Sequence, residues 1–150
     1  MHSLRALYQI GHGPSSSHTM GPAKAVRRIL DRHPDATSLD ITLYNSLALT
    51  GKGHLTEEAI RETASPVGVA FSTSIDLNRH PNTLVVNVTE PDADPLSYEV
   101  QSVGGGRIVF VGEEEEEPDV YPHRTFKDIK RYCKQENLTL FDYVVRMEGE

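Results

Sequence analysis

The chain has 150 residues, of which 37% are hydrophobic and 25% charged, and its formal net charge is −7. This composition is typical of a globular protein, and a chain of this length buries enough surface for one core. The single cysteine, Cys133, excludes an internal disulfide, a four-cysteine zinc site and an iron–sulfur cluster held by this chain alone. No apolar run approaches the roughly 20 residues that span a bilayer, and no signal-peptide core is present, so we expect a cytoplasmic protein.

Charge is distributed unevenly along the chain. Residues 1–34 contain five basic residues and one acidic residue, whereas the remainder contains ten basic and 21 acidic residues. The acidic excess lies mainly in Asp92–Asp94 and Glu113–Asp119, and such a composition disfavours nucleic acid as a partner. The basic N-terminal part is explained equally by attraction of a small anion and by a solvated helix face.

The spacing of apolar residues, glycine and proline predicts the elements of the first half of the chain. In order, they are a short amphipathic segment at 3–10, an irregular loop at 11–18, a helix from Thr19 to about His33, a strand at 39–49, a glycine-rich break at 50–54 and a helix up to about Thr63. Thr56 is the expected N-cap of that last helix, and its first turn is acidic, which suits a helix N-terminus.

The second half is predicted to change from strands to helices. We expect strands at 67–71, 83–89 and 97–111, a bulge or bend at glycines 104–106, an acidic loop at 113–117, and helices at 125–136 and 139–147. Each of these helices begins with threonine and has aspartate three residues later, and Cys133 is expected in their core. The prediction is an α/β domain at 1–118, followed by a helical linker segment at 119–150.

The first segment with chemical character is Gly13–Pro22, which leads into the predicted helix. A helix N-terminus offers unpaired N–H groups and a positive dipole end, both suited to a carboxylate or phosphate. Hydroxyl groups and one imidazole add to these donors, from Ser15, Ser16, Ser17, His18 and Thr19. The simpler interpretation is a single N-cap followed by a solvated loop, and the sequence leaves both open.

The second segment is Leu47–His54, in which a predicted strand ends in Gly51, Lys52 and Gly53 before a helix. A phosphate-binding P-loop is excluded, because Gly53 stands where that motif needs serine or threonine. His54 is better interpreted as a proton carrier, since imidazole titrates near neutral pH. The alternative is an ordinary loop histidine.

Two further site classes are disfavoured. The histidines at positions 12, 18, 54 and 80 lack the close spacing typical of zinc ligands, so we predict no metal site in this chain. A serine hydrolase would require a nucleophile elbow of the form G-x-S-x-G, and the chain contains none.

Four stretches together resemble one enzyme family. GPSSSHTMGPAKA (13–25), YNSLALTGKGH (44–54) and YEVQSVGGGRI (98–108) resemble the β domain, or β subunit, of iron–sulfur-dependent bacterial L-serine dehydratases. The stretch from Thr125 onward is similar to the helical segment that follows this domain in single-chain members. The resemblance implies an α/β sandwich like the allosteric substrate-binding domain of some phosphoglycerate dehydrogenases.

The resemblance also implies the reaction and the site. These enzymes convert L-serine to pyruvate and ammonia, with a [4Fe–4S] cluster bound by a separate catalytic α domain rather than by this one. Carried over by motif, His54 and His18 are expected to be catalytic. Substrate binding is expected from Ser15, Ser16, Ser17, Thr19, Gly51, Lys52 and Gly53, and the motif HPNT makes His80 and Asn82 second-tier candidates.

The resemblance further implies what accompanies this chain. We expect a partner catalytic domain or subunit, L-serine as ligand and no activity without the cluster domain, and a homodimer is left open. The chain is expected to be part of a longer enzyme, since it has no cluster-binding cysteines. The alternative function is a docking module that senses L-serine or a small anion and regulates a partner.

Overall fold

A computed structural model describes residues 3–7, 10–11, 13–113 and 119–149. The chain forms two compact units, Ile10–Glu115 and a smaller unit made of Met1–Gln9 with Glu116–Glu150. The acidic run beyond Glu113 and His12 lie outside the described residues. Within the described part of the chain, no helix is long and apolar enough to cross a membrane.

The larger unit is built on a five-stranded sheet. Its strands are β1 (Ser38–Tyr44), β2 (Gly68–Ser74), β3 (Thr83–Thr89), β4 (Leu96–Gly104) and β5 (Arg107–Phe110), in the order β2-β1-β3-β4-β5. β1 and β2 are parallel, and the other neighbouring pairs are antiparallel. The predicted α/β class is confirmed.

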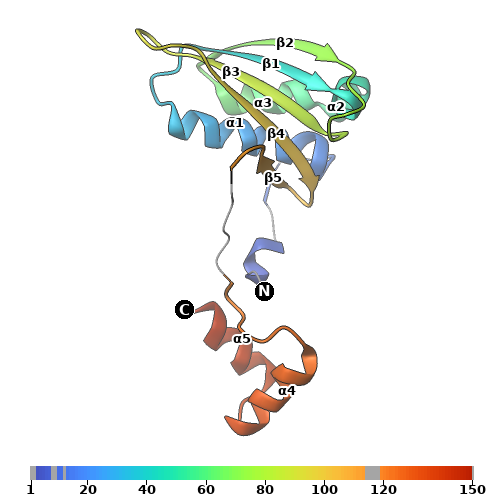
Figure 1. Ribbon diagram of the computed structural model, residues 1–150, viewed down its shortest axis with the longest axis vertical. Helices are drawn as coiled ribbons and strands as arrows, with labels where there is room; N and C mark the ends of the chain where they lie inside the picture. Colours follow the sequence, from blue (N-terminus) through green and yellow to red (C-terminus); the bar gives the residue numbers. More distant parts are fainter. Residues whose placement is uncertain (1–2, 8–9, 12, 114–118, 150) are drawn as a thin grey trace. The chain divides into compact units, whose positions relative to one another are not determined.

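Three helices cover one face of this sheet: α1 (Gly21–Arg32), α2 (Asn45–Thr50) and α3 (Thr56–Ala64), as Figure 1 shows. Alternate residues of the central strands point toward the helices, which places Leu39, Ile41 and Leu43 of β1 in the core beside Ile29 and Ile60. The core therefore lies between two layers, and residues at the helix N-termini collect at one end of the sheet.

The helix predicted to begin at Thr19 begins three residues earlier. A π-helical turn, η2 (Ser16–Met20), runs directly into α1, and the hydroxyl of Ser15 accepts a hydrogen bond from the backbone N–H of His18 at 3.2 Å. Ser15 is therefore the N-cap, and the serine-rich segment predicted as loop forms the first helical turn.

The strand predicted at 39–49 ends at Tyr44 instead. Asn45 adopts a left-handed conformation (φ 50°), which asparagine tolerates better than most residues, and the chain turns there into α2. Leu47 stays buried because the same apolar spacing also fits a helix. The break at 50–54 is a short 3₁₀ helix, η3 (Gly51–His54).

Two further predictions are corrected by backbone geometry. Thr56 is the first residue of α3 rather than its N-cap, because Leu55 precedes it with φ 57° and makes no side-chain cap. The strand predicted at 97–111 is the hairpin β4–β5, because Gly104, Gly105 and Gly106 all have positive φ and turn the chain back. The irregularity predicted at these glycines is present, since the pairing register shifts between Ser102 and Gly104.

The smaller unit contains the two predicted helices, α4 (Phe126–Gln135) and α5 (Leu140–Glu148). Thr125 and Thr139 cap them, and Thr139 forms a capping box with Asp142. Cys133 is half-buried, not a core residue as predicted, because α4 has no fully buried residue and packs through only part of its surface.

The N-terminal segment belongs to this smaller unit. The carboxylate of Glu148 accepts hydrogen bonds from the Ser3 hydroxyl (2.5 Å), the Leu4 backbone N–H (2.7 Å) and the Tyr121 hydroxyl (2.5 Å). These donors lower the pKa of Glu148, with that of Ser3 contributing most. Burial, and then the neighbouring carboxylate, raise the pKa of Tyr121 to about 12.

Candidate functional site

The two motifs predicted to carry chemistry lie side by side in the larger unit. The hydroxyl of Thr19, in η2, donates to the backbone carbonyl of His54, in η3, at 2.8 Å. This contact brings the imidazole rings of His18 and His54 to a centroid distance of 4.8 Å. The structure therefore assembles one candidate site from two loops that are separate in sequence.

His18 contacts a hydroxyl group at each ring nitrogen. Its Nδ1 lies 2.9 Å from the Ser17 hydroxyl, and its Nε2 lies 3.0 Å from the Ser46 hydroxyl. Burial, and secondly the proximity of His54, lower the pKa of His18, while an interaction with the Ser46 backbone acts in the opposite direction. The lowered pKa favours the neutral form of His18, in which one ring nitrogen donates and the other accepts.

His54 has a more restricted hydrogen-bonding arrangement. Its Nδ1 lies 3.0 Å from the backbone carbonyl of Thr50, which can only accept a hydrogen bond. Nδ1 must therefore carry the proton in neutral His54, and the lone pair lies on Nε2. The geometry gives His54 a defined nitrogen at which to accept a proton.

The remaining residues of the two motifs differ in exposure. Ser15, Ser16 and Ser17 are partly buried at the start of the helix, whereas Thr19 is almost fully buried and its hydroxyl is engaged by His54. In η3, Gly51 is buried, and a Cβ there would lie 3.3 Å from the Thr56 hydroxyl. Lys52 and Gly53 are exposed.

The loop that contains the HPNT motif contacts the site through Ser46. Nδ1 of His80 accepts from the Asn82 backbone N–H at 3.1 Å, and the Pro81 carbonyl accepts from the Ser46 backbone N–H at 2.8 Å. The loop therefore supports the residue that contacts His18. The Asn82 side-chain amide donates to the backbone carbonyl of Ser102 at 3.4 Å.

Sequence reasoning missed two polar residues of this region, Ser46 and Ser102. Ser46 lies in the stretch 44–54, directly before Leu47. That position is the sequence feature that could have indicated it. Ser102 is fully buried on β4 against Gly21, a contact that no local pattern indicates. The side-chain oxygens of Ser102 and Asn82 are buried and have no hydrogen-bond partner among the described residues.

No group of three or more histidine, cysteine, aspartate or glutamate side chains in the described ranges is arranged to hold a metal ion. Cys133, the single cysteine, is a partly buried residue of the helical unit, whereas a [4Fe–4S] cluster is held by several thiolates. The residues described here therefore do not fit a resident cluster.

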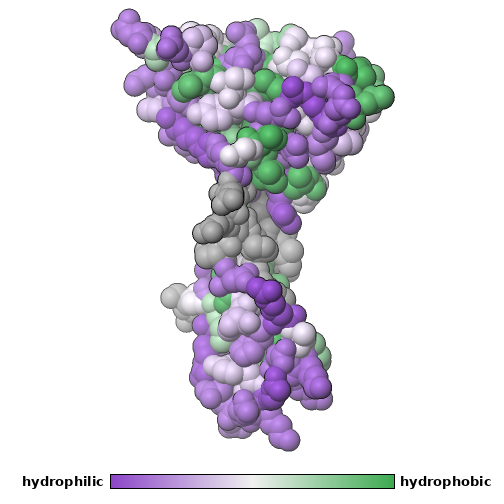
Figure 2. All heavy atoms as spheres, in the orientation of Figure 1, coloured by the Kyte–Doolittle hydropathy of each residue, from purple (hydrophilic) through white to green (hydrophobic). Residues whose placement is uncertain are grey.

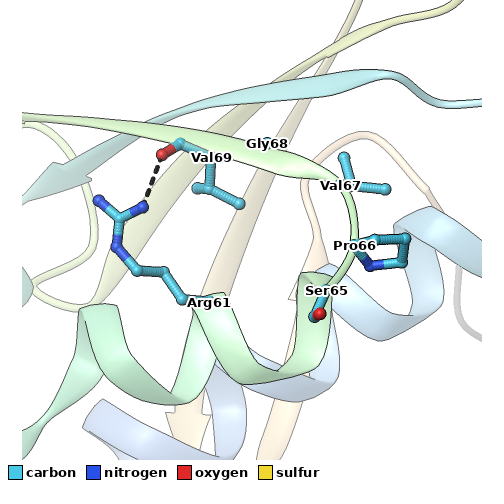
Figure 3. Close-up of a pocket in the computed structure, with 6 residues that line it drawn as sticks. All are labelled: Arg61, Ser65, Pro66, Val67, Gly68 and Val69. Carbon is cyan, nitrogen blue, oxygen red and sulfur yellow. Dashed lines mark hydrogen bonds between the residues drawn. The ribbon is translucent and has the colours of Figure 1, made fainter.

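A separate shallow pocket of about 220 Å³ lies where α3 ends and β2 begins (Figure 3). It is lined by Arg61, Ser65, Pro66, Val67, Gly68 and Val69, and the Arg61 guanidinium donates to the Val69 carbonyl at 2.9 Å. None of the sequence-predicted site residues lines this pocket, and its guanidinium is already engaged by protein.

The fold and the site thus define an α/β domain in which a serine-rich helix N-terminus lies beside a pair of histidines. Comparison with known proteins agrees with the resemblance found in the sequence: residues 3–65 match the family model of the serine dehydratase beta chain.

Full-length enzymes show similarity beyond this region. The chain is 29% identical to L-serine dehydratase 2 of Escherichia coli K12 over 196 aligned residues, covering 99% of this chain and 43% of that enzyme. It is 27% identical to the L-serine dehydratase of Haemophilus influenzae, covering 100% of this chain and 43% of that enzyme. A Helicobacter pylori L-serine dehydratase is 47% identical over 62 residues, or 39% of this chain and 14% of that enzyme. The chain spans 43% of the length of the first two relatives.

Proposed function

We propose that this chain is the β-domain portion of an L-serine dehydratase and supplies substrate-binding and proton-transfer groups for converting L-serine to pyruvate and ammonia. The observation that carries the proposal is the 4.8 Å approach of His18 and His54 beside a serine-rich helix N-terminus. The comparisons support it, because residues 3–65 match the beta chain family of this enzyme.

The chemistry requires an anchored carboxylate and a base for the α-proton of L-serine. The partly buried hydroxyls of Ser15, Ser16 and Ser17 and the N-terminal N–H groups of the helix are suited to a carboxylate. Nε2 of His54 accepts the α-proton. The Cβ–O bond then breaks, and the departing hydroxyl leaves as water with the help of an acid or Lewis acid that the catalytic domain would supply, which gives aminoacrylate. Its imine tautomer is then hydrolysed to pyruvate and ammonia. General-base catalysis of this kind contributes roughly 10²–10⁴-fold.

A second domain completes this site in the proposal. Leu49 lies five residues before His54 and Leu55 directly after it, and these leucines are 76% and 49% exposed. Hydrophobic surface is visible at the end of the sheet where α2 lies (Figure 2). These features favour coverage by the catalytic α domain, which would also hold the [4Fe–4S] cluster that this chain does not fit.

The architecture supports the same assignment at a coarser level. A two-layer α/β unit with helices on one face is compatible with the allosteric substrate-binding domain of phosphoglycerate dehydrogenases, and we include that fold relationship in the proposal. The chain alone is then expected to have no dehydratase activity.

The test is reconstitution of the chain with the complementary catalytic part of its enzyme under anaerobic conditions, with pyruvate measured from L-serine. His54→Ala is expected to reduce turnover at least about 100-fold. His123→Gln, in the helical unit, is the matched histidine control and should retain activity. Turnover of His54→Ala within a few-fold of wild type would contradict the proton-transfer role.

The reconstitution also separates the proposal from the sensing alternative. Absence of pyruvate from the wild-type mixture, together with calorimetric binding of L-serine by the chain alone, would favour a regulatory module over a catalytic one.

A further inference from the structure

His18 is held between hydroxyl groups from two different elements. Ser17 belongs to the same helical turn and faces Nδ1 at 2.9 Å, whereas Ser46 comes from α2 and faces Nε2 at 3.0 Å. A hydroxyl donates or accepts a hydrogen bond, so this pair is compatible with either neutral tautomer of the ring. The contact with Ser46 therefore ties the orientation of His18 to a second element.

Ser46 is itself fixed independently of His18. Its backbone N–H donates to the Pro81 carbonyl at 2.8 Å. The side chain of Asn45 donates to the Asp76 carbonyl at 2.7 Å and accepts from the Asp76 N–H at 2.8 Å, which secures the left-handed turn just before Ser46. The hydroxyl of Ser46 is thus presented to His18 by a turn that the 76–81 loop supports.

The neighbouring histidine is oriented differently. Nδ1 of His54 faces the Thr50 carbonyl and keeps its proton, so its tautomer is set by the backbone. The tautomer of His18 depends instead on side-chain hydroxyls. Of these two histidines, His18 is therefore the one whose tautomer a single side-chain substitution can change.

We infer that Ser46 is a positioning residue that holds the imidazole of His18 and, together with Ser17, determines how its two ring nitrogens are hydrogen-bonded, leaving His54 as the histidine that exchanges a proton with substrate. The effect of Ser46 on catalysis rests on the proposed function. The hydrogen bond between Ser46 and His18 can be tested in this chain alone. In imidazolium His18, Nε2–H donates to the Ser46 oxygen, so the hydroxyl favours the charged form.

The experiment is an NMR titration of the histidine rings in the 150-residue chain, with ¹⁵N shifts reporting each tautomer. Ser46→Ala is expected to change the tautomer ratio of His18 and to lower its pKa, because Nε2 loses its hydroxyl partner. The Nδ1–H tautomer of His54 should stay unchanged. Ser46→Thr retains the hydroxyl and should restore the wild-type signature, and Ser72→Ala, on β2, is the matched serine control.

If Ser46→Ala leaves both the pKa and the tautomer of His18 unchanged in a folded chain, the inference is overturned. Ser46→Cys, which keeps a side chain of similar shape, provides the same test should the alanine variant fold poorly. In the reconstituted enzyme, Ser46→Ala should lower kcat more than it changes KM. If the reconstituted wild-type enzyme produced no pyruvate, the proposed function would be contradicted. The NMR test of the hydrogen bond between Ser46 and His18 would be unaffected.

Discussion

Gly21 and Ser102 approach each other so closely that the helix position accepts no side chain. A Cβ on Gly21 would lie 2.0 Å from the hydroxyl oxygen of Ser102 and 2.9 Å from its Cβ. The absence of a side chain lets the junction of η2 and α1 lie directly on β4. At the residue scale, this contact fixes where the serine-rich turn sits on the sheet.

Gly21→Ala is therefore expected to destabilise the chain by about 1–3 kcal/mol, although alanine is the better helix former by about 1 kcal/mol. Urea denaturation measures the effect. Gly53→Ala, where a Cβ meets nothing within 4 Å, is the control and should be close to neutral. Equal stability of the two variants would contradict the close packing, whereas adding Ser102→Gly to Gly21→Ala should recover part of the loss.

At the scale of elements, α2 depends on the turn that Asn45 makes after β1. This residue combines a left-handed backbone with two hydrogen bonds to the backbone of Asp76. The turn directs Ser46 toward His18 and allows η3 to follow directly after α2. A short helix with little stability of its own is thus positioned by tertiary contacts.

Asn45→Ala is expected to cost about 2–4 kcal/mol, since it loses the two hydrogen bonds to Asp76 and a longer one to the Arg79 carbonyl, and places alanine at positive φ. Asn45→Gly loses the same hydrogen bonds but tolerates the backbone, so it should be more stable than the alanine variant by about 1 kcal/mol. Thermal or chemical denaturation of both variants measures the difference. An alanine variant as stable as the glycine variant would show that backbone strain at this position is unimportant.

At the scale of the whole molecule, each of the two compact units has its own internal contacts. The larger unit, Ile10–Glu115, contains every described residue of the candidate site. In the smaller unit, Glu148 joins α5 to the N-terminal segment through Ser3 and Leu4. Changes to that carboxylate should therefore affect one unit and not the other.

Glu148→Ala is expected to increase amide hydrogen exchange in α4 and α5 and to leave the His18 and His54 NMR signatures unchanged. The wild type should show a related pH effect. Because the folded-state pKa of Glu148 is lowered from 4.5, its stabilising contribution is present above that value and is lost as pH falls below it. Exchange rates at pH 6 and pH 4 in both proteins measure this, and an equal pH response in the variant would contradict it.

Much of the fold could be predicted from sequence, because hydrophobic periodicity and helix-capping residues act over short stretches of chain. The α/β class, the strand at 83–89 and the threonine-capped helices α4 and α5 follow from periodicity and capping residues. The wrong boundaries fall where a long-range contact or unusual backbone decides the outcome. Asn45 turns left-handed because Asp76 is there to bind it, and three consecutive glycines close a hairpin instead of bending one strand.

The candidate site divides in the same way. By itself, the sequence determined the serine-rich helix N-terminus and the two histidine loops, because the required residue types lie close together along the chain. The tertiary structure decided that His18 and His54 face each other, that Ser46 completes the surroundings of His18, and that Ser102 packs against Gly21. These contacts join residues far apart in sequence, and they arise because helices packed on one face of the sheet bring their N-termini to a common end.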